Sequence, residues 1–261
     1  ATRGPVNMPF GATQALCKVV FKSLPSADRP ANAGQMRPLR VRAEPGTLYH
    51  AVYPAPTFTL WTALVSVELV TKALAQAMPD RIAASSGGDV PGFMMIGTHP
   101  DTGQFFAISN NDPVGWGATP THDGSSALSH LSSSIVRNTP VEVLETRTTM
   151  LMEKVELRAD SGGAGQHRGG LGTDRVIRFM TAGEFMMVMK KSKSPPWAMA
   201  GGRESRPNEA IAFPGTAKQR TLRTTRVPVE AGDQVLVRSA GGGGYGDPPR
   251  RDPAAIRPGI E

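Results

Sequence analysis

The sequence predicts an α+β fold in which a helix-containing N-terminal part packs on a largely antiparallel, sheet-rich C-terminal part. Three observations support this prediction. Two segments before residue 80 repeat apolar residues with the 3.6-residue period of an α-helix. Short apolar runs bounded by Gly, Pro or Asp dominate after residue 141. The 29 glycines and 23 prolines indicate a chain rich in turns. We therefore expect two parts, residues 1–140 and 141–261.

Both predicted helices lie in the N-terminal part. From Ala12 to Leu24, polar residues recur at every fourth position opposite a stripe of Ala, Leu and Val, which is typical of an amphipathic helix. The segment from Trp61 to Met78 is apolar over most of its circumference, so we expect a substantially buried helix. It ends before Pro79.

The predicted strands are short. Alternating residues favour a strand at Leu39–Ala43, and Phe93–Ile96 and Gln104–Ile108 predict a hairpin with its turn at Asp101–Gly103. His99, beside that turn, is expected to be solvated. The C-terminal part contains five more predicted strands: Glu153–Leu157, Arg175–Met180, Glu184–Met189, Glu209–Phe213 and Gln234–Arg238. The Pro-rich tail after Asp247 predicts an extended surface arm.

The segment 158–172 has the densest combination of glycine and reactive side chains. Six glycines frame Asp160, Ser161, His167 and Arg168, which excludes a helix or strand interior. Such glycines either adopt positive φ or let another backbone come close. The segment is therefore either a pair of tight turns or a phosphate cradle. Neither the dinucleotide fingerprint nor the P-loop motif occurs, so ATP, if used, is held by another chain.

A second chemically dense stretch runs from residue 110 to 130. It is long for a loop without secondary structure, and such loops are often functional. Trp116, between two glycines, is either the wall of a pocket or a buried anchor. His122, Asp123 and His130 lack the spacing of a zinc site, so these residues predict no metal centre.

Composition narrows the function classes. Cys17 is the single cysteine, no apolar run reaches the length of a membrane span, and no signal-peptide core is present, so we expect a cytoplasmic protein without membrane contact. The net charge is +7, and residues 131–261 carry 20 of the 29 Lys and Arg against 14 of the 22 acidic residues. Aromatic residues are only 6% and are not interleaved with the cations, which argues against nucleic acid. An acidic partner or an anionic substrate explains the charge as well.

Seven blocks, in one order, resemble the signatures of the hydantoinase B family. They are Arg3–Asn7, Pro30–Gly34 with Arg37-Pro38, Asn138–Glu142, Ala159–Gly165 with Arg168–Gly172, Pro195–Trp197 with Ala200–Gly202, Gly241–Pro248, and Arg251–Pro253. That family includes N-methylhydantoinase, ATP-dependent 5-oxoprolinase, caprolactamase, and the acetone and acetophenone carboxylases. The resemblance covers the C-terminal half of a family-length polypeptide.

The resemblance implies a multi-subunit, ATP-dependent enzyme. A hydantoinase-A-like partner subunit would bind ATP and Mg and phosphorylate a carbonyl oxygen of the substrate. The most direct expectation is hydrolysis of a cyclic amide such as a hydantoin or lactam. One alternative is carboxylation of a ketone such as acetone or acetophenone, and another is a non-catalytic structural subunit. Hetero-oligomeric partners would include the A-type subunit and the N-terminal half of the B-type polypeptide.

The resemblance also nominates site residues. The family's ligands for a divalent metal such as Mn or Zn belong to an upstream segment outside this chain, so none is assigned here, and a fragment, a processing product or a split subunit is expected. The candidate catalytic residues are His122, Asp123, Asp160, His167 and Arg168. The candidate substrate-binding residues are Trp116, Ser161 and Asp247. An imidazole or carboxylate could deprotonate water, and the Arg168 fork could hold a phosphate or carboxylate. Alternatively, Asp160 and Asp247 cap turns, and Arg168 pairs with one of them.

Overall fold

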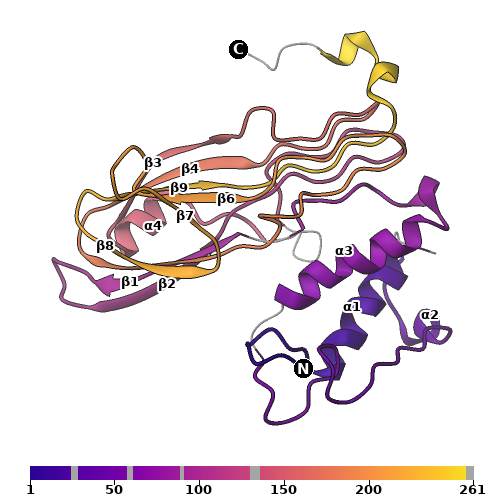
Figure 1. Cartoon of the computed structure of the whole chain (residues 1–261), viewed down its shortest axis with the longest axis horizontal. Helices are drawn as coiled ribbons and strands as arrows, with labels where there is room; N and C mark the ends of the chain where they lie inside the picture. Colours follow the sequence, from indigo (N-terminus) through magenta and orange to yellow (C-terminus); the bar gives the residue numbers. More distant parts are fainter. Residues whose placement is uncertain (25–28, 58–60, 89–90, 130–135, 257–261) are drawn as a thin grey trace. The chain divides into compact units, whose positions relative to one another are not determined.

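The computed structural model describes residues 1–24, 29–57, 61–88, 91–129 and 136–256 (Figure 1). The chain divides into two compact units, Ala1–Ile82 and Ala83–Glu261, each described by itself. The expected boundary between residues 140 and 141 falls inside the second unit, where strand β1 (Gly92–Thr98) pairs with strand β5 (Gly183–Val188) across it. The packing of the helical part on the sheets stays a prediction.

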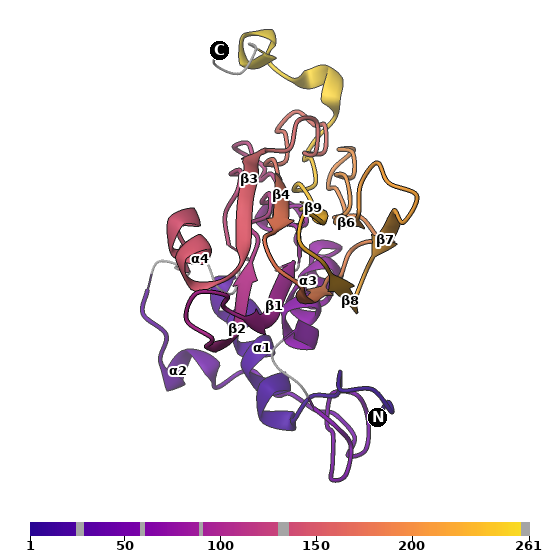
Figure 2. The same ribbon diagram turned by 90° about the vertical axis from the view of Figure 1, so that its left-hand side faces the viewer.

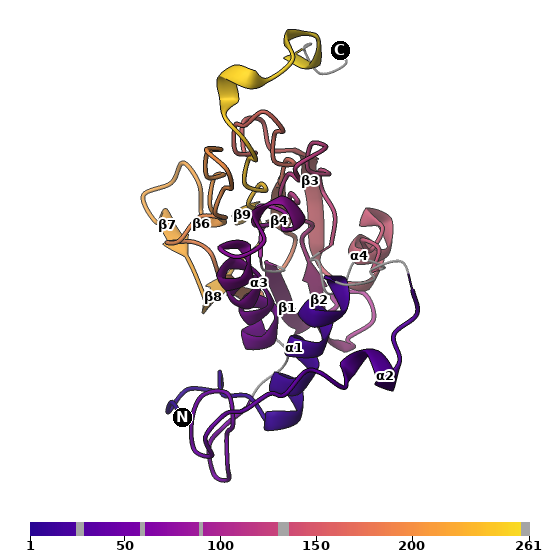
Figure 3. The ribbon, with the colours of Figure 1, turned by 90° about the vertical axis from the view of Figure 1, so that its right-hand side faces the viewer.

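The first unit is helical. Its elements are α1 (Phe10–Ser23), α2 (Ala33–Met36), α3 (Trp61–Ala75) and the 3-10 turn η1 (Pro79–Arg81). Helices α1 and α3 lie side by side (Figure 3), and buried side chains of both pack together with Met8. Both predicted long helices are confirmed. The predicted strand Leu39–Ala43 is wrong: its side chains alternate in exposure, but its backbone joins no ladder among the described residues.

The second unit contains two antiparallel sheets, so the α+β class is confirmed. One sheet has the order β2-β1-β5-β8 and the other β3-β4-β9-β6-β7 (Figures 1 and 2). The strands are β1 (Gly92–Thr98), β2 (Phe105–Asn111), β3 (Met150–Leu157), β4 (Thr173–Phe179), β5 (Gly183–Val188), β6 (Glu209–Ala212), β7 (Arg220–Leu222), β8 (Thr225–Val229) and β9 (Gln234–Arg238). The predicted hairpin and all five predicted C-terminal strands are present.

Apolar side chains from both sheets form one core. Phe93 and Phe185 stack with ring centroids 5.8 Å apart, and Phe179 from the other sheet meets Phe185 edge-on at 5.5 Å. Strand β4 alternates buried and half-buried residues along its length, as expected when one face of a sheet lies on a core. The two sheets therefore form a sandwich.

Among the described residues of this unit, one α-helix and two strands were not predicted. The segment Val141–Arg147 is helix α4, which follows Pro140 and buries Leu144 in the sandwich core. Its two valines individually favour a strand, but the segment forms a helix that contacts the core through Leu144. Strands β7 and β8 are short, and β8 tolerates Pro228 because it lies at a sheet edge.

Beyond the sandwich, five extended segments run side by side, and we call them the glycine bundle: residues 84–88, 113–118, 161–172, 196–203 and 240–246 (Figure 1). Segment 240–246 hydrogen-bonds to all four others. Gly115 N donates to Ala240 O (2.9 Å), Gly163 N to Gly242 O (2.8 Å), and Gly243 N to Ser85 O (2.7 Å). Met199 N donates to Gly244 O at 3.0 Å. A strand in a sheet has two neighbours, so this bundle is packed in three dimensions.

Close approach of another backbone explains most of the glycines of the bundle. A Cβ on Gly242 would lie 1.8 Å from the carbonyl oxygen of Trp116, and a Cβ on Gly117 would lie 1.8 Å from that of Ala84. Neither residue has positive φ. Within segment 158–172, a Cβ on Gly169 would lie 1.8 Å from the carbonyl oxygen of Gly242, and none of the glycines has positive φ. Of the two roles expected for glycine there, the structure therefore supports the approach of a second backbone. Positive φ occurs there at Asp160 (54°).

Candidate functional site

Four of the predicted site residues meet at the end of the glycine bundle, where Asp123 is the centre of a cluster. The backbone N–H of Arg168 donates to Asp123 Oδ1 at 2.7 Å. His167 Nδ1 lies 3.9 Å from the same oxygen. His122 precedes Asp123, and its Nδ1 lies 2.9 Å from the Asp123 carbonyl oxygen. We call His122, Asp123, His167, Arg168 and Arg251 the rim cluster.

Arg251 was not predicted as a site residue. Its Nη1 and Nη2 donate to the two carboxylate oxygens of Asp123 at 2.8 and 2.7 Å, and Nη1 also donates to Gln166 O at 3.2 Å. This fork lowers the pKa of Asp123, burial opposes the shift, and the Arg168 N–H adds to it. Asp123 is therefore held ionised, and its carboxylate is occupied by the Arg251 guanidinium and the Arg168 N–H.

Arg251 also corrects the prediction for the C-terminal tail. Residues after Asp247 form two 3-10 turns, η3 (Pro248–Arg250) and η4 (Pro253–Ile256), and the bidentate pair with Asp123 ties them to the bundle. The Arg251-Asp252-Pro253 triplet contributed to the family resemblance, but its partner is 128 positions away in the chain. No local pattern could reveal that pairing.

The chemistry available at the rim cluster resides in its imidazoles. A carbonyl oxygen only accepts hydrogen bonds, so His122 donates from Nδ1, and its Nε2 is the acceptor in the neutral ring. His122 and Arg168 are exposed, and His167 is half-buried. An acceptor imidazole beside an exposed guanidinium can take a proton from water near an anionic group.

The other candidates lie elsewhere. Ser161 is fully buried: its hydroxyl donates to Arg158 O (2.7 Å) and accepts from Gly172 N (2.9 Å). Trp116 is half-buried and donates from Nε1 to Ser129 O at 2.7 Å. Asp160 and Asp247 are exposed, and among the described residues no hydrogen bond or ion pair joins either of them to the rim cluster.

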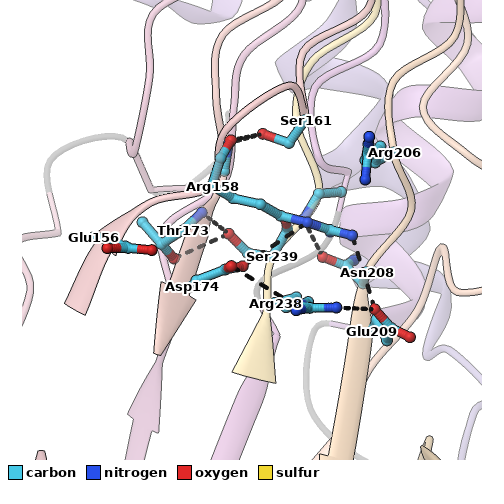
Figure 4. Close-up of polar contacts among 12 residues, drawn as sticks. Glu156, Arg158, Ser161, Thr173, Asp174, Arg206, Asn208, Glu209, Arg238 and Ser239 are labelled. Atoms are coloured by element: carbon cyan, nitrogen blue, oxygen red, sulfur yellow. Dashed lines mark hydrogen bonds and ion pairs between the residues drawn. The ribbon is translucent and has the colours of Figure 1, made fainter. Parts of the chain in front are cut away.

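Figure 4 shows the polar network around Ser161 at the base of the bundle. Arg158 Nη1 donates to Pro207 O (2.8 Å) and Ser239 O (3.1 Å), and its guanidinium lies 3.8 Å from Asp174 and 3.9 Å from Glu209. Burial lowers the pKa of Arg158, and the two carboxylates oppose this shift. These contacts tie the end of β3 to β4, β6 and β9, which indicates a structural role.

Asp112 belongs to a different, buried ion pair. It follows β2, and its Oδ1 lies 2.8 Å from Arg175 Nε on β4, although neither carboxylate oxygen receives a well-aligned hydrogen bond. Burial raises the pKa of Asp112 to about 6, and the charge of Arg175 opposes the increase. The Arg175 guanidinium lies 5.6 Å from the centroid of the Phe93 ring. The pair crosses the sandwich from one sheet to the other.

In the part of the chain that the structure describes, the glycine runs do not form a phosphate cradle and the side chains do not gather as a metal site. In the glycine runs, the N–H groups of Gly163, Gly169, Gly170, Gly242, Gly243 and Gly244 all donate to backbone carbonyls. These donors are therefore not directed at a phosphate. In residues 1–24, 29–57, 61–88, 91–129 and 136–256, no three His, Cys, Asp or Glu side chains come together as a metal site. His130 lies outside these ranges.

The family is decided by comparison with known proteins. A model of hydantoinase B/oxoprolinase matches residues 1–248. The chain belongs to this family. One relative is the 5-oxoprolinase PfmaA of Pestalotiopsis fici, which is 29% identical to this chain. The match covers 94% of this chain and 20% of that protein.

Two solved structures of the hydantoinase B-like fold extend the comparison. ATP-dependent caprolactamase from Pseudomonas jessenii superposes with a TM-score of 0.85 and 26% identity, over 97% of this chain and 46% of that chain. An acetone carboxylase shares the fold with a TM-score of 0.78 at 16% identity, over 97% of this chain and 39% of that one. The present chain spans less than half of the length of the curated relatives that it matches. No helix in the described part of the chain has the length and apolarity needed to cross a membrane.

Proposed function

We propose that this chain works within an ATP-dependent assembly that hydrolyses a cyclic amide such as a hydantoin or lactam. The observation that carries the proposal is the match to ATP-dependent caprolactamase over 97% of the chain at 26% identity. An amide carbonyl is a poor electrophile until its oxygen becomes a leaving group, and phosphorylation supplies that change. The glycine runs of this chain donate their N–H groups internally, which favours an A-type partner subunit as the holder of ATP and Mg.

Within that assembly, we assign the rim cluster to proton transfer and anion binding. His122 or His167 would accept a proton from the attacking water, and Arg168 would bind the phosphate or carboxylate that forms. Asp123 and Arg251 would act as positioning residues, because each is committed to the other by two hydrogen bonds. Asp160, Ser161, Trp116 and Asp247 have weaker support, since the structure does not join them to this cluster.

Ring opening by the complete complex tests the proposal. The full-length B-type polypeptide would be reconstituted with its A-type subunit, and phosphate release and ring opening would be followed with hydantoin, 5-oxoproline and caprolactam. We expect His122→Gln, His167→Gln or Arg168→Gln to lower kcat by about tenfold to a hundredfold without loss of assembly. His99→Gln is a matched control, because His99 Nδ1 also lies 3.9 Å from a carboxylate oxygen, that of Asp101, in the β1–β2 hairpin.

The same assay separates the alternatives. If the complex turns over a ketone and this turnover requires bicarbonate, the reaction is carboxylation and not amide hydrolysis. For this alternative, the acetone carboxylase match supports the fold alone. If the three rim variants keep full activity while assembly depends on the chain, the chain has a structural role.

A further inference from the structure

An open groove of about 660 Å³ lies in the first unit, lined by residues of α1, of α2 and of the segment that precedes α2. Three apolar side chains form part of its lining: Val19 on α1, and Ala33 and Met36 on α2. Val19 is 47% exposed although it lies in the middle of its helix. This apolar surface is open to a ligand.

Cations surround this apolar lining. Lys18 and Lys22 are one turn apart on α1, and Arg37 follows α2. No described residue that lines the groove carries a carboxylate. The described lining of the groove therefore combines apolar surface with positively charged side chains and no carboxylate.

The charge of the whole first unit agrees with this picture. Residues 1–82 contain 9 Lys and Arg against 4 Asp and Glu, a net charge of +5 out of the chain's +7. Residues 83–130 contain no Lys or Arg. The acidic residues of 83–130 offset this positive charge, so residues 1–130 together carry 9 Lys and Arg against 8 Asp and Glu.

We propose that this groove docks an acidic amphipathic segment of a partner polypeptide. The 14 residues of α1 extend about 21 Å, which matches a partner helix of about four turns. Such a helix would place its apolar side on Val19 and Met36 and its carboxylates near Lys18 and Arg37. Nucleic acid fits less well, because no aromatic ring among the described lining residues is available to stack on a base.

The proposal does not depend on which carbonyl compound the assembly uses. Binding of a defined probe tests it directly on the 261-residue chain. The probe is a fluorescein-labelled 15-residue helical peptide with Leu on one face and Glu on the other, and its counterpart replaces every Glu by Lys. We expect the Glu peptide to bind with an affinity that falls as salt rises, and the Lys peptide to bind at least about tenfold more weakly.

Substitutions locate the binding. Lys18→Glu with Arg37→Glu, and separately Val19→Asp, should each weaken the Glu peptide by about tenfold or more, with an unchanged circular dichroism spectrum. The pair Arg40→Glu and Arg42→Glu makes the same charge change at exposed positions that do not line the groove, and should have less than about a twofold effect. Equal loss in both charge pairs would indicate non-specific attraction and overturn the proposal.

Two further outcomes would overturn it. One is displacement of the peptide by ATP or by double-stranded DNA at lower concentration than by unlabelled peptide, which would mark a small-anion or nucleic-acid site. The other is normal assembly of the reconstituted complex with Lys18→Glu and Arg37→Glu. That second result would overturn the docking proposal alone. Turnover, measured in the same sample, tests the proposed reaction separately.

Discussion

The sandwich and the glycine bundle of the second unit are held together in opposite ways. In the sandwich, large side chains such as Phe185 and Phe179 fill the space between two sheets. In the bundle, backbones approach so closely that Gly242 and Gly117 have no room for a Cβ, and hydrogen bonds between segments replace side-chain packing. A core position of the sandwich thus requires a side chain of suitable volume, whereas glycine positions such as 117 and 242 of the bundle require the absence of a Cβ atom.

The two Asp–Arg pairs show the same division. At the end of the bundle, Asp123 faces the fork of Arg251 near solvent, and its pKa is lowered. In the sandwich, Asp112 is fully buried beside Arg175, and its pKa is raised. Both arginines lower the pKa of their partner carboxylate, so the net shift depends on whether hydrogen bonding and charge or the loss of solvent dominates.

The largest expected effect is at the bundle. Gly242→Ala places a Cβ 1.8 Å from a backbone carbonyl that other hydrogen bonds hold in place, so we expect a loss of more than about 5 kcal/mol and no soluble folded protein. Soluble yield and urea unfolding measure this. The control is Gly11→Ala on α1, where nothing lies within 4 Å of the added atom, and a change within about 1 kcal/mol is expected. Tolerance of Gly242→Ala would refute the close-packing explanation.

In the sandwich, removal of volume should be costly but compatible with folding. Phe185→Ala leaves a cavity at the contact of three aromatic rings, and we expect a loss of about 3–5 kcal/mol in the free energy of unfolding. Phe105→Ala, at a position 72% exposed on β2, should change it by less than about 1 kcal/mol. Similar losses at the two positions would show that the core does not depend on this packing.

The buried ion pair predicts an unusual pH dependence. The pKa of Asp112 is about 6 in the folded chain against 3.8 as its ordinary value, so the folded state holds more protons than the unfolded state between these values. Stability contributed by this group should therefore decrease as pH rises from about 4 to 6, by on the order of 3 kcal/mol, and then stay constant. Urea unfolding of the wild-type chain and of Asp112→Asn across this range isolates the effect. The opposite slope would mean that Arg175 outweighs burial.

The smallest effect is expected at the end of the bundle. Asp123→Asn keeps an acceptor for the Arg168 N–H but loses the charge that Arg251 binds, so global stability should fall by less than about 1 kcal/mol. Hydrogen exchange in residues 248–256 should increase at neutral pH. Because the pKa of Asp123 is lowered, its contribution is present above pH 3.8 and is lost as the pH falls below that value. Unchanged exchange would show that other contacts hold the tail.

Local sequence patterns determined much of this protein. The 3.6-residue period located α1 and α3, alternation between Gly and Pro boundaries located the hairpin and five strands, and ordered motifs indicated the family. These features depend on neighbours within a few positions, or on fixed short motifs. The sequence also pointed to segment 158–172 as glycine-dependent, without deciding between turns, a phosphate cradle and close packing.

Only the tertiary structure decided what the glycines are for and which charges meet. Segments 113–118, 161–172 and 240–246 hydrogen-bond to one another over separations from 54 positions (Gly170 to Trp116) to 125 positions (Gly115 to Ala240), and Arg251 reaches Asp123 over 128 positions. Helix α4 was not predicted, and it buries Leu144 in the sandwich core. The physical reason is the same in each case: periodicity records which side of an element is apolar, whereas a partner is chosen by the three-dimensional approach of backbones and charges that the local sequence does not encode.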